Sequence, residues 1–196
     1  LCIHIGECGK SDGELFEAGR NPWCVPNKTS IEQVTEIVER CPTGALTYQA
    51  KDGQICESTP SENNVAVINN GPYFFTGDLN IEEIPDDMPG VAHRAALCRC
   101  GLSRNQPFCD NSHESASVKD YGAIGQRGEA TNETGGKLNI KPLEDGPLLL
   151  NGNLTLTAGS GRKAWQGNKA ALCRCGASKT KPFCDGSHTE AGFKSN

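Results

Sequence analysis

Residues 98–113 read CRCGLSRNQPFCDNSH, and this stretch decides the fold because the chain contains it twice. Residues 173–188 read CRCGASKTKPFCDGSH, so every cysteine and histidine of the first stretch recurs 75 positions later. An internal repeat of this kind sets the architecture of a chain before any single element does. We therefore expect two copies of one structural unit, each carrying one cysteine-histidine loop.

The repeat extends upstream of both loops without a gap. Gly71-Pro72 recurs as Gly146-Pro147, and the Ala-Ala-Leu sequence at 95–97 recurs at 170–172. Short apolar runs separated by Gly and Asn precede each loop, which is typical of strands and turns. Residues 65–68 and 73–75 in the first copy, and 148–150 and 154–156 in the second, are the predicted strands. We expect two β-rich repeats, 65–118 and 140–193. Because a unit of about 50 residues hardly buries enough surface to fold alone, the two repeats would pair as an intrachain pseudo-dimer and gain further stability from metal binding.

The spacing of the cysteines and histidines predicts two ligand pairs in each loop. Two thiolates separated by one residue can share one metal ion, and the later Cys and His are close enough in sequence to share another if they lie on one helical turn. Thiolate and imidazole suit both iron-sulfur clusters and zinc, so residue type alone leaves both open. The candidate ligands are Cys98, Cys100, Cys109 and His113 in the first loop, and Cys173, Cys175, Cys184 and His188 in the second.

Residues around the ligands fit the same interpretation. Asp110 and Asp185 follow the third cysteine of each loop, where a carboxylate can accept the unpaired N–H groups at the start of a helix. Arg99 and Arg174 lie between ligands, either donating toward cluster sulfur or lying on a solvated face. The polar, glycine-rich residues 120–137 between the repeats predict a linker or exposed loop.

Both loops resemble the CDGSH iron-sulfur domain of the mitoNEET-like proteins, whose pattern is C-x-C-x2-[ST]-x3-P-x-C-D-G-[SAT]-H. The second loop matches this pattern throughout, and the first departs from it at Asn111, where the family has Gly. Asn tolerates the left-handed backbone region, so the loop should keep its shape. The resemblance implies a 2Fe-2S cluster in each repeat, with the C-x-C cysteines on one iron and the later Cys and His on the outer iron. Zinc remains the alternative.

The first third of the chain is a different module. Cys2 and Cys8 lie near the start, and Cys41-Pro42 follows a segment with helical periodicity. Together they resemble a divergent single-cluster ferredoxin-like domain, which would span residues 1–50. The resemblance makes Cys2, Cys8 and Cys41 ligands of a 3Fe-4S or 4Fe-4S cluster, with Cys24 or His4 as a fourth ligand. The alternative is that these thiols are buried and bind no metal.

The helix of this module has a clear start. Ser30 and Gln33 have the spacing of a capping box, in which each side chain accepts a hydrogen bond from the other residue's backbone N–H. The predicted apolar face consists of Ile31, Val34, Ile37 and Val38. The whole chain is therefore predicted to be an α+β protein, with a small ferredoxin-like domain followed by two β-rich repeats.

Composition restricts the function classes. An odd number of cysteines, eleven, with two C-x-C pairs that are followed by histidines, favours metal binding in a reducing, cytoplasmic compartment over a disulfide framework. The net charge of −5 and the scattered Lys and Arg residues argue against nucleic acid. No apolar run is long enough for a membrane span.

We expect an electron carrier whose partners are a reductase or an electron acceptor. Imidazole ligation raises cluster potential relative to all-cysteine ferredoxins. The alternatives are a protein that stores iron-sulfur clusters or transfers them to apo-proteins, and a redox or iron sensor. The sequence shows no nucleophile with its base, so we do not expect an enzyme. The chain would act either as a monomer with internal pseudo-symmetry or as a homodimer.

Overall fold

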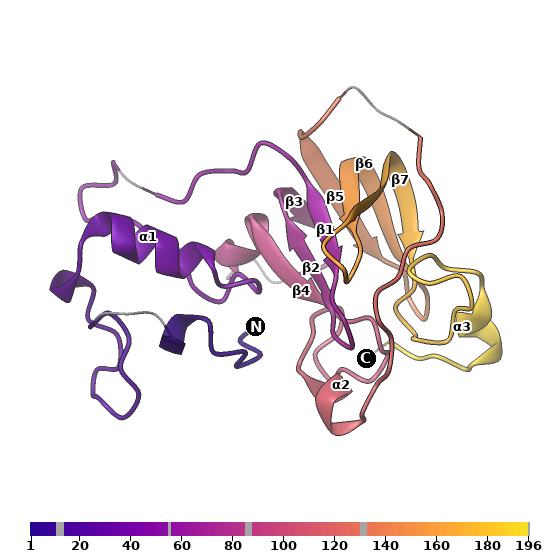
Figure 1. Cartoon of the computed structure of the whole chain (residues 1–196), viewed down its shortest axis with the longest axis horizontal. Coiled ribbons are helices and arrows are strands. Elements are labelled where there is room, and N and C mark those ends of the chain that lie inside the picture. The colour runs from indigo at the N-terminus through magenta and orange to yellow at the C-terminus, as the bar shows by residue number, and fades with distance from the viewer. Residues whose placement is uncertain (11–13, 55, 85–87, 130–132, 196) are drawn as a thin grey trace.

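The computed structural model describes residues 1–10, 14–54, 56–84, 88–129 and 133–195, and it is a mixed α+β fold (Figure 1). One β-sheet carries both cysteine-histidine loops, and the helices are short. The predicted α+β class is therefore confirmed. In chain order the elements are η1 (Cys8–Lys10), η2 (Pro26–Lys28), α1 (Ile31–Glu39), β1 (Asn64–Val67), β2 (Tyr73–Thr76), β3 (Asp78–Ile81), η3 (Pro89–Ala92), β4 (Arg94–Leu97), α2 (Ser112–Ser115), β5 (Lys137–Pro142), β6 (Leu148–Thr157), β7 (Lys163–Leu172) and α3 (Ser187–Glu190).

The strands of the described residues form one sheet in the order β3-β5-β6-β1-β2-β4, with β7 paired to β6. Within the first repeat β2 pairs antiparallel with β1 and with β4. Within the second repeat β6 pairs antiparallel with β5 and with β7. The predicted strands at 65–68 and 73–75 correspond to β1 and β2, while 148–150 and 154–156 are the two halves of β6.

Strands of different repeats also pair with each other, and here the pairing is parallel. Val65 of β1 lies opposite Leu156 of β6. Ile81 of β3 lies opposite Ile140 of β5. Val65 of the first repeat corresponds to Ile140 of the second repeat, 75 positions later, and Ile81 corresponds in the same way to Leu156. The same parallel contact is therefore made twice, once from each repeat toward the other.

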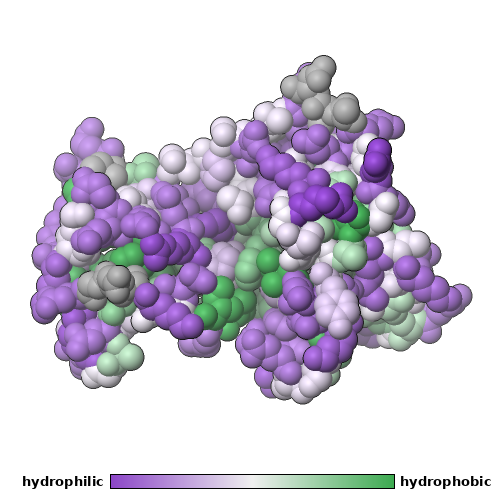
Figure 2. Space-filling view, viewed as in Figure 1, coloured by the Kyte–Doolittle hydropathy of each residue, from purple (hydrophilic) through white to green (hydrophobic). Residues whose placement is uncertain are grey.

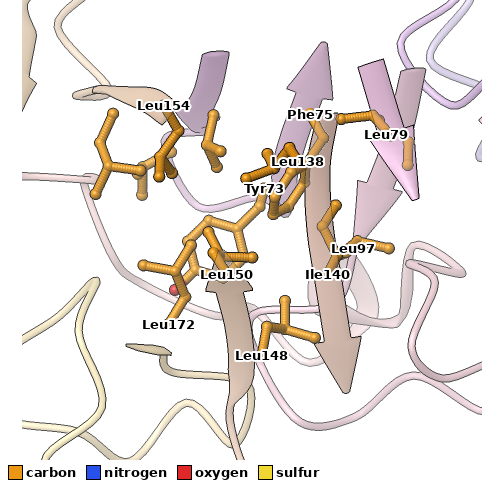
Figure 3. Packing of buried hydrophobic residues seen from close by; sticks show 14 of the residues in the cluster. Tyr73, Phe75, Leu79, Leu97, Leu138, Ile140, Leu148, Leu150, Leu154 and Leu172 are labelled. Carbon is orange, nitrogen blue, oxygen red and sulfur yellow. The ribbon is translucent and has the colours of Figure 1, made fainter. Parts of the chain in front are cut away.

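The hydrophobic core is built from both repeats at once. Tyr73 and Phe75 of β2 are fully buried together with Leu138 and Ile140 of β5 and with Leu150 of β6. Figure 3 shows side chains from these strands meeting in one layer. Burying one large apolar side chain contributes roughly 1.5–3 kcal/mol. Because each repeat supplies only part of this layer, neither repeat has a core of its own.

The helix of the amino-terminal module forms as expected, with one difference. Ser30 accepts a hydrogen bond from the Gln33 backbone, and the Gln33 side chain accepts one from Ser30, so the capping box is present. Ile37 and Val38 are buried, but Ile31 is 51% exposed. Ile31 therefore belongs to the predicted apolar face but is not buried with it, because the first turn of the helix extends beyond the small cluster that its last turn covers.

A buried arginine connects this module to the sheet. Arg94, at the start of β4, donates to the backbone carbonyls of Val38 and Leu46 in the amino-terminal module. Its guanidinium also lies 2.7 Å from a carboxylate oxygen of Glu57, and both side chains are almost fully buried. The corresponding residue of the second repeat is Lys169. The first repeat therefore holds the amino-terminal module through a residue that the second repeat lacks.

The segment between the repeats is more than an exposed linker. The Asp120 carboxylate lies 2.7 Å from the Arg99 guanidinium, and Ile124 is buried in the main core. Residues 130–132 of this segment lie outside the described residues. The predicted linker or exposed loop at 120–137 is exposed at most of its described positions, but Ile124 is buried in the main core and Gly122 accepts a hydrogen bond from the Gly159 backbone.

Candidate functional site

The first cysteine loop continues directly from the end of β4. Leu97 is the last residue of the strand, so Cys98 leaves the sheet at a fixed position. Two backbone hydrogen bonds of 2.8 Å close the loop, from Cys98 to Pro107 and from Cys109 to Ala96. They hold Cys109 beside the strand that delivers Cys98. The Sγ atoms of Cys98 and Cys100 are 3.8 Å apart.

The second ligand pair of this loop is also assembled. The Cys109 Sγ lies 3.5 Å from Nδ1 of His113. His113 belongs to the short helix α2, but Cys109 precedes that helix, so the expectation that both lie on one helical turn is wrong. Asn111 lies between them with a φ of 71°, and this left-handed residue turns the chain so that the two side chains meet.

The second loop repeats the C-x-C spacing and the backbone closure of the first. Cys173 and Cys175 have their Sγ atoms 3.7 Å apart. The Cys184 backbone donates to Ala171 over 2.8 Å, which repeats the closure seen in the first loop. Gly186 takes the left-handed position with a φ of 88°, and His188 lies in α3. Figure 1 shows α2 and α3 at the same end of the sheet.

These distances fit metal-bound pairs. Two thiolates on one tetrahedral metal at about 2.3 Å each are about 3.8 Å apart, and a thiolate and an imidazole on one metal are about 3.6 Å apart. Among the described residues no group of three or more Cys, His, Asp or Glu side chains gathers around a single point. Each of these pairs could share one metal ion, and thiolate and imidazole suit both iron-sulfur clusters and zinc.

A carboxylate stabilises the turn between the third cysteine and the histidine. Asp110 accepts hydrogen bonds from the backbones of Ser112 and Arg104, and Asp185 makes the corresponding bonds in the second loop. Burial raises the pKa of Asp110, but the hydrogen bonds from Ser112 and Arg104 outweigh it and lower the pKa to about 2. The expectation that these carboxylates accept helix N–H groups is confirmed, and each also ties the loop back on itself.

The two arginines between the ligands have a different role from either one expected. Arg99 and Arg174 are buried, so they do not lie on a solvated face. Arg99 donates to the carbonyls of Gly71 and Ile68. Arg174 donates to the corresponding carbonyls of Gly146 and Leu143. Both guanidinium groups bind the turn between two strands, and neither is directed toward the cysteine sulfur atoms by these bonds.

Burial makes one thiol of the first loop a weak acid. Desolvation raises the pKa of Cys109 to about 11, and burial also lowers the pKa of His113. A metal ligand must be a thiolate or a neutral imidazole. His113 therefore meets this requirement at neutral pH, while Cys109 must lose a proton when a metal binds.

Tyr73 contacts the second cysteine-histidine loop, and this contact was not predicted from the sequence. Its buried hydroxyl donates to the carbonyls of Cys173 and Pro182, at 2.9 and 3.1 Å. Tyr73 belongs to the first repeat, and both acceptors belong to the second. The corresponding residue for the first loop is Leu148, which has no hydroxyl, so the repeat alignment gave no signal for this role.

The amino-terminal cysteines are partly assembled. The Cys2 Sγ lies 3.8 Å from Nδ1 of His4. Burial raises the pKa of the Cys8 thiol, and the nearby Cys2 and Cys41 thiols raise it further. The three predicted ligands therefore lie within electrostatic range of one another. Cys24 pairs with Phe16 in a small bridge, whereas His4 contacts the predicted ligand Cys2.

Comparison with known proteins places these sites in two families. Residues 70–114 and 145–189 match the family described as iron-binding zinc finger, CDGSH type. Residues 1–51 match the family described as divergent 4Fe-4S mono-cluster. The chain is also 37% identical over 51 residues, 26% of this chain and 67% of the relative, to the protein titled "Uncharacterized protein YjdI" of Escherichia coli strain K12. The protein of that title from Escherichia coli O157:H7 gives the same values.

The fold, the paired cysteine and histidine ligands, and these matches define an iron-sulfur-binding protein. The chain belongs to the CDGSH family, carries two tandem copies of its domain, and has a divergent ferredoxin-like domain at its amino-terminal end. In the described part of the chain no helix is both long and apolar enough to cross a membrane.

Proposed function

We propose that this protein binds two 2Fe-2S clusters and transfers single electrons. Cys98, Cys100, Cys109 and His113 would hold the first cluster, and Cys173, Cys175, Cys184 and His188 the second. The observation that carries this proposal is the geometry of the ligand pairs, with sulfur atoms 3.8 and 3.7 Å apart and a thiol-imidazole pair 3.5 Å apart. A bound cluster of this type accepts and releases one electron at a potential raised by its histidine.

The protein residues would keep the ligands fixed while the charge changes. Arg99 and Arg174 bind strand-turn carbonyls, and Asp110 and Asp185 bind the loop backbone, so each ligand pair is supported from both sides. A rigid ligand set reduces the structural change that accompanies a change of charge. This support favours repeated electron transfer over a single chemical event.

The chain would form three modules, with the two repeats as an intrachain pseudo-dimer. The proposed boundaries are 1–50 for the ferredoxin-like domain, 65–118 for the first repeat and 140–193 for the second. The reciprocal parallel pairs β1 with β6 and β3 with β5, together with the shared core, support this division. One chain would thus supply both halves of a symmetric unit.

The ferredoxin-like domain would hold a third cluster. Cys2, Cys8 and Cys41 would be its ligands, with His4 as the fourth if the cluster is of the 4Fe-4S type. The Cys2–His4 distance of 3.8 Å supports His4 over Cys24. Three ligands alone would suit a 3Fe-4S cluster. A second kind of redox centre in one chain favours an electron relay, with a cytoplasmic reductase and an acceptor protein as partners, over an enzyme.

Cluster transfer to apo-proteins is the second candidate function. Its support is the partial exposure of Cys184 and His188, because an acceptor protein must reach the outer ligands to receive a cluster. Storage of clusters would require the same reversible cluster binding as transfer. A redox or iron sensor would need a partner that distinguishes the cluster-loaded protein from the cluster-free protein.

Mixing the cluster-loaded protein with an apo-ferredoxin separates the two candidates. An electron carrier should keep its clusters over many turnovers with a reductase and a one-electron acceptor, and the apo-ferredoxin should remain empty. Transfer of intact clusters to the apo-ferredoxin within minutes, with loss of iron from this protein, would contradict the electron-transfer proposal and favour delivery.

A further inference from the structure

An amino-terminal side chain packs directly on a predicted ligand of the first repeat. Ile3 forms a small buried cluster with Cys109 and Ala96, and Phe74 packs against it. Ile3 is 3% exposed and Cys109 is 4% exposed. Under the proposed function, Cys109 would bind the outer iron of the first cluster. The amino-terminal segment therefore covers the outer ligand of one cluster.

The corresponding place on the second repeat is open. The positions that match Phe74 and Ala96 are Leu149, which is 37% exposed, and Ala171, which is partly exposed. Cys184 is also partly exposed, whereas its counterpart Cys109 is buried. The C-x-C sulfur spacing and the backbone closures are the same in both loops. What differs at the outer cysteine is the packing of Ile3 from the amino-terminal segment on Cys109.

The histidine ligands differ in the same direction. His113 is 8% exposed, while His188 is only partly buried. A hollow of about 360 Å³ lies beside His113, and Ile3 and Ile5 form part of its wall together with Phe74. Figure 2 shows apolar residues gathered between the amino-terminal part and the sheet on this face of the molecule. The segment thus forms one wall of the hollow next to the imidazole, in addition to covering the thiol.

Attachment of the module makes this cover a stable part of the fold. Arg94 binds two carbonyls of the amino-terminal module and pairs with the buried carboxylate of Glu57. The module is therefore fixed to β4, the strand that ends one residue before the first ligand, Cys98. Removing Ile3 from Cys109 requires a local opening against apolar burial, and such openings limit the access of reagents to buried groups.

We propose that the two CDGSH-type clusters are functionally distinct: the amino-terminal segment, through Ile3, protects the first cluster from external molecules, and the second cluster is the one that meets them. This inference rests on the proposed binding of two 2Fe-2S clusters. A redox partner or an apo-protein acceptor would approach the surface around Cys184 and α3. The first cluster would remain inside the protein, next to the ferredoxin-like domain.

The test is the rate at which each cluster is lost to excess EDTA at neutral pH. Aliquots are reduced and frozen, and the 2Fe-2S electron paramagnetic resonance signal is followed with time. We expect two phases of equal size, with the slow phase roughly tenfold or more slower than the fast phase, as expected when one site needs a local opening. Ile3→Asp should accelerate the slow phase toward the fast one and leave the fast phase unchanged.

Two variants control for other causes. Ile31→Asp makes the same substitution at a 51% exposed position of the same module, and it should change neither phase. Asn111→Gly makes the sequence of the first turn like that of the second, and the two phases should persist because the cover is intact. If Asn111→Gly merges the phases, the loop sequence rather than Ile3 causes the difference and the inference is wrong.

A single phase in the unmodified protein would overturn the inference while leaving the proposed function intact. The same holds if Ile3→Asp accelerates neither phase or accelerates the fast one. A preparation with no 2Fe-2S signal would instead contradict the proposed function itself. If Ile3→Asp loosens the whole amino-terminal segment, Cys109 is still exposed. The expected acceleration therefore does not depend on how the cover over Cys109 is lost.

Discussion

The first and second cysteine-histidine loops have the same C-x-C spacing and the same supporting hydrogen bonds but different surroundings. Their C-x-C sulfur atoms are 3.8 and 3.7 Å apart, and both loops are supported by a buried arginine and a turn carboxylate. Yet Cys109 is covered by the amino-terminal segment, while Cys184 is partly exposed. Ligand geometry is thus determined by the loop sequence, and access to the ligands is determined by distant parts of the chain.

The largest expected effect comes from removing one ligand of either loop. Cys109→Ser and Cys184→Ser should each abolish one 2Fe-2S cluster, because serine is a poor ligand for an iron-sulfur centre. Iron bound by the two repeats should fall by half in each variant, as measured by iron analysis and visible absorbance.

Cys56→Ser is the control for this pair, since Cys56 is exposed and has no counterpart in either repeat. It should keep all the iron. Complete loss of iron from both repeats in either ligand variant would show that the two sites do not load independently, which would contradict the comparison of two separate sites.

Arg94→Met should have the next largest effect. It leaves the Glu57 carboxylate buried without its partner and removes the bonds to the amino-terminal module. Breaking a buried ion pair in this way costs about 3–5 kcal/mol. Chemical denaturation should show this loss, and EDTA should remove the first cluster faster.

Arg40→Met is a matched control, because Arg40 forms an exposed ion pair with Glu36 on the same module. Exposed pairs contribute about 0–1 kcal/mol, so its unfolding curve should hardly move. Equal effects of the two substitutions would contradict a special role for Arg94 in attaching the module.

Asp120→Asn should destabilise the first loop in a pH-dependent way. Burial raises the pKa of Asp120, but hydrogen bonds from Arg99 and Gly122 outweigh it and hold the pKa below its usual value. The lowered pKa means that the ionised form stabilises the fold above about pH 4, and that this contribution is lost as pH falls through the folded-state pKa. The corresponding residue of the second repeat is Ser195, which carries no charge.

The difference in unfolding free energy between the unmodified protein and Asp120→Asn should be about 1.5–3 kcal/mol at pH 7. It should shrink as the pH is lowered below about 4. Urea denaturation at several pH values measures it. A difference that grows on acidification would have the wrong sign and would exclude Asp120 as the stabilising group.

Tyr73→Phe should have the smallest effect, and it should act on the other loop. It removes the hydroxyl that donates to the Cys173 and Pro182 carbonyls. The expected loss is about 1 kcal/mol, the net value of one buried hydrogen bond. Thermal unfolding measures the loss, and EDTA should remove the second cluster faster while the first is unaffected. Faster loss of the first cluster instead would contradict this assignment of Tyr73.

The sequence predicted those parts of the structure that depend on neighbouring residues. The repeat offset, the capping box at Ser30 and the strands before each loop were all evident from local patterns. The candidate ligand pairs in the first loop also come together as their spacing indicated. These features follow from hydrogen bonds and backbone preferences within a few residues.

Features that join distant residues could not be predicted in the same way. Ile3 is separated from Cys109 by most of the first repeat, and Tyr73 reaches across to the second loop. The exposed position of Ile31 depends on where the small amino-terminal cluster ends, which helical periodicity does not specify. The burial of Arg99 depends on carbonyls some 30 residues away. Each of these contacts exists only after the modules have packed together.

The proposal that each loop binds a 2Fe-2S cluster through three cysteines and one histidine is tested most directly on anaerobically purified protein. Its iron and sulfide content is measured together with electron paramagnetic resonance spectra that resolve coupling to nitrogen. Two bound 2Fe-2S clusters should give about four irons, with each cluster coupled to one histidine nitrogen and further irons in a distinct signal if the ferredoxin-like domain is loaded. His113→Cys and His188→Cys should each remove one nitrogen coupling. Zinc in place of iron, or 2Fe-2S centres without nitrogen coupling, would show that the two loops do not bind clusters as proposed.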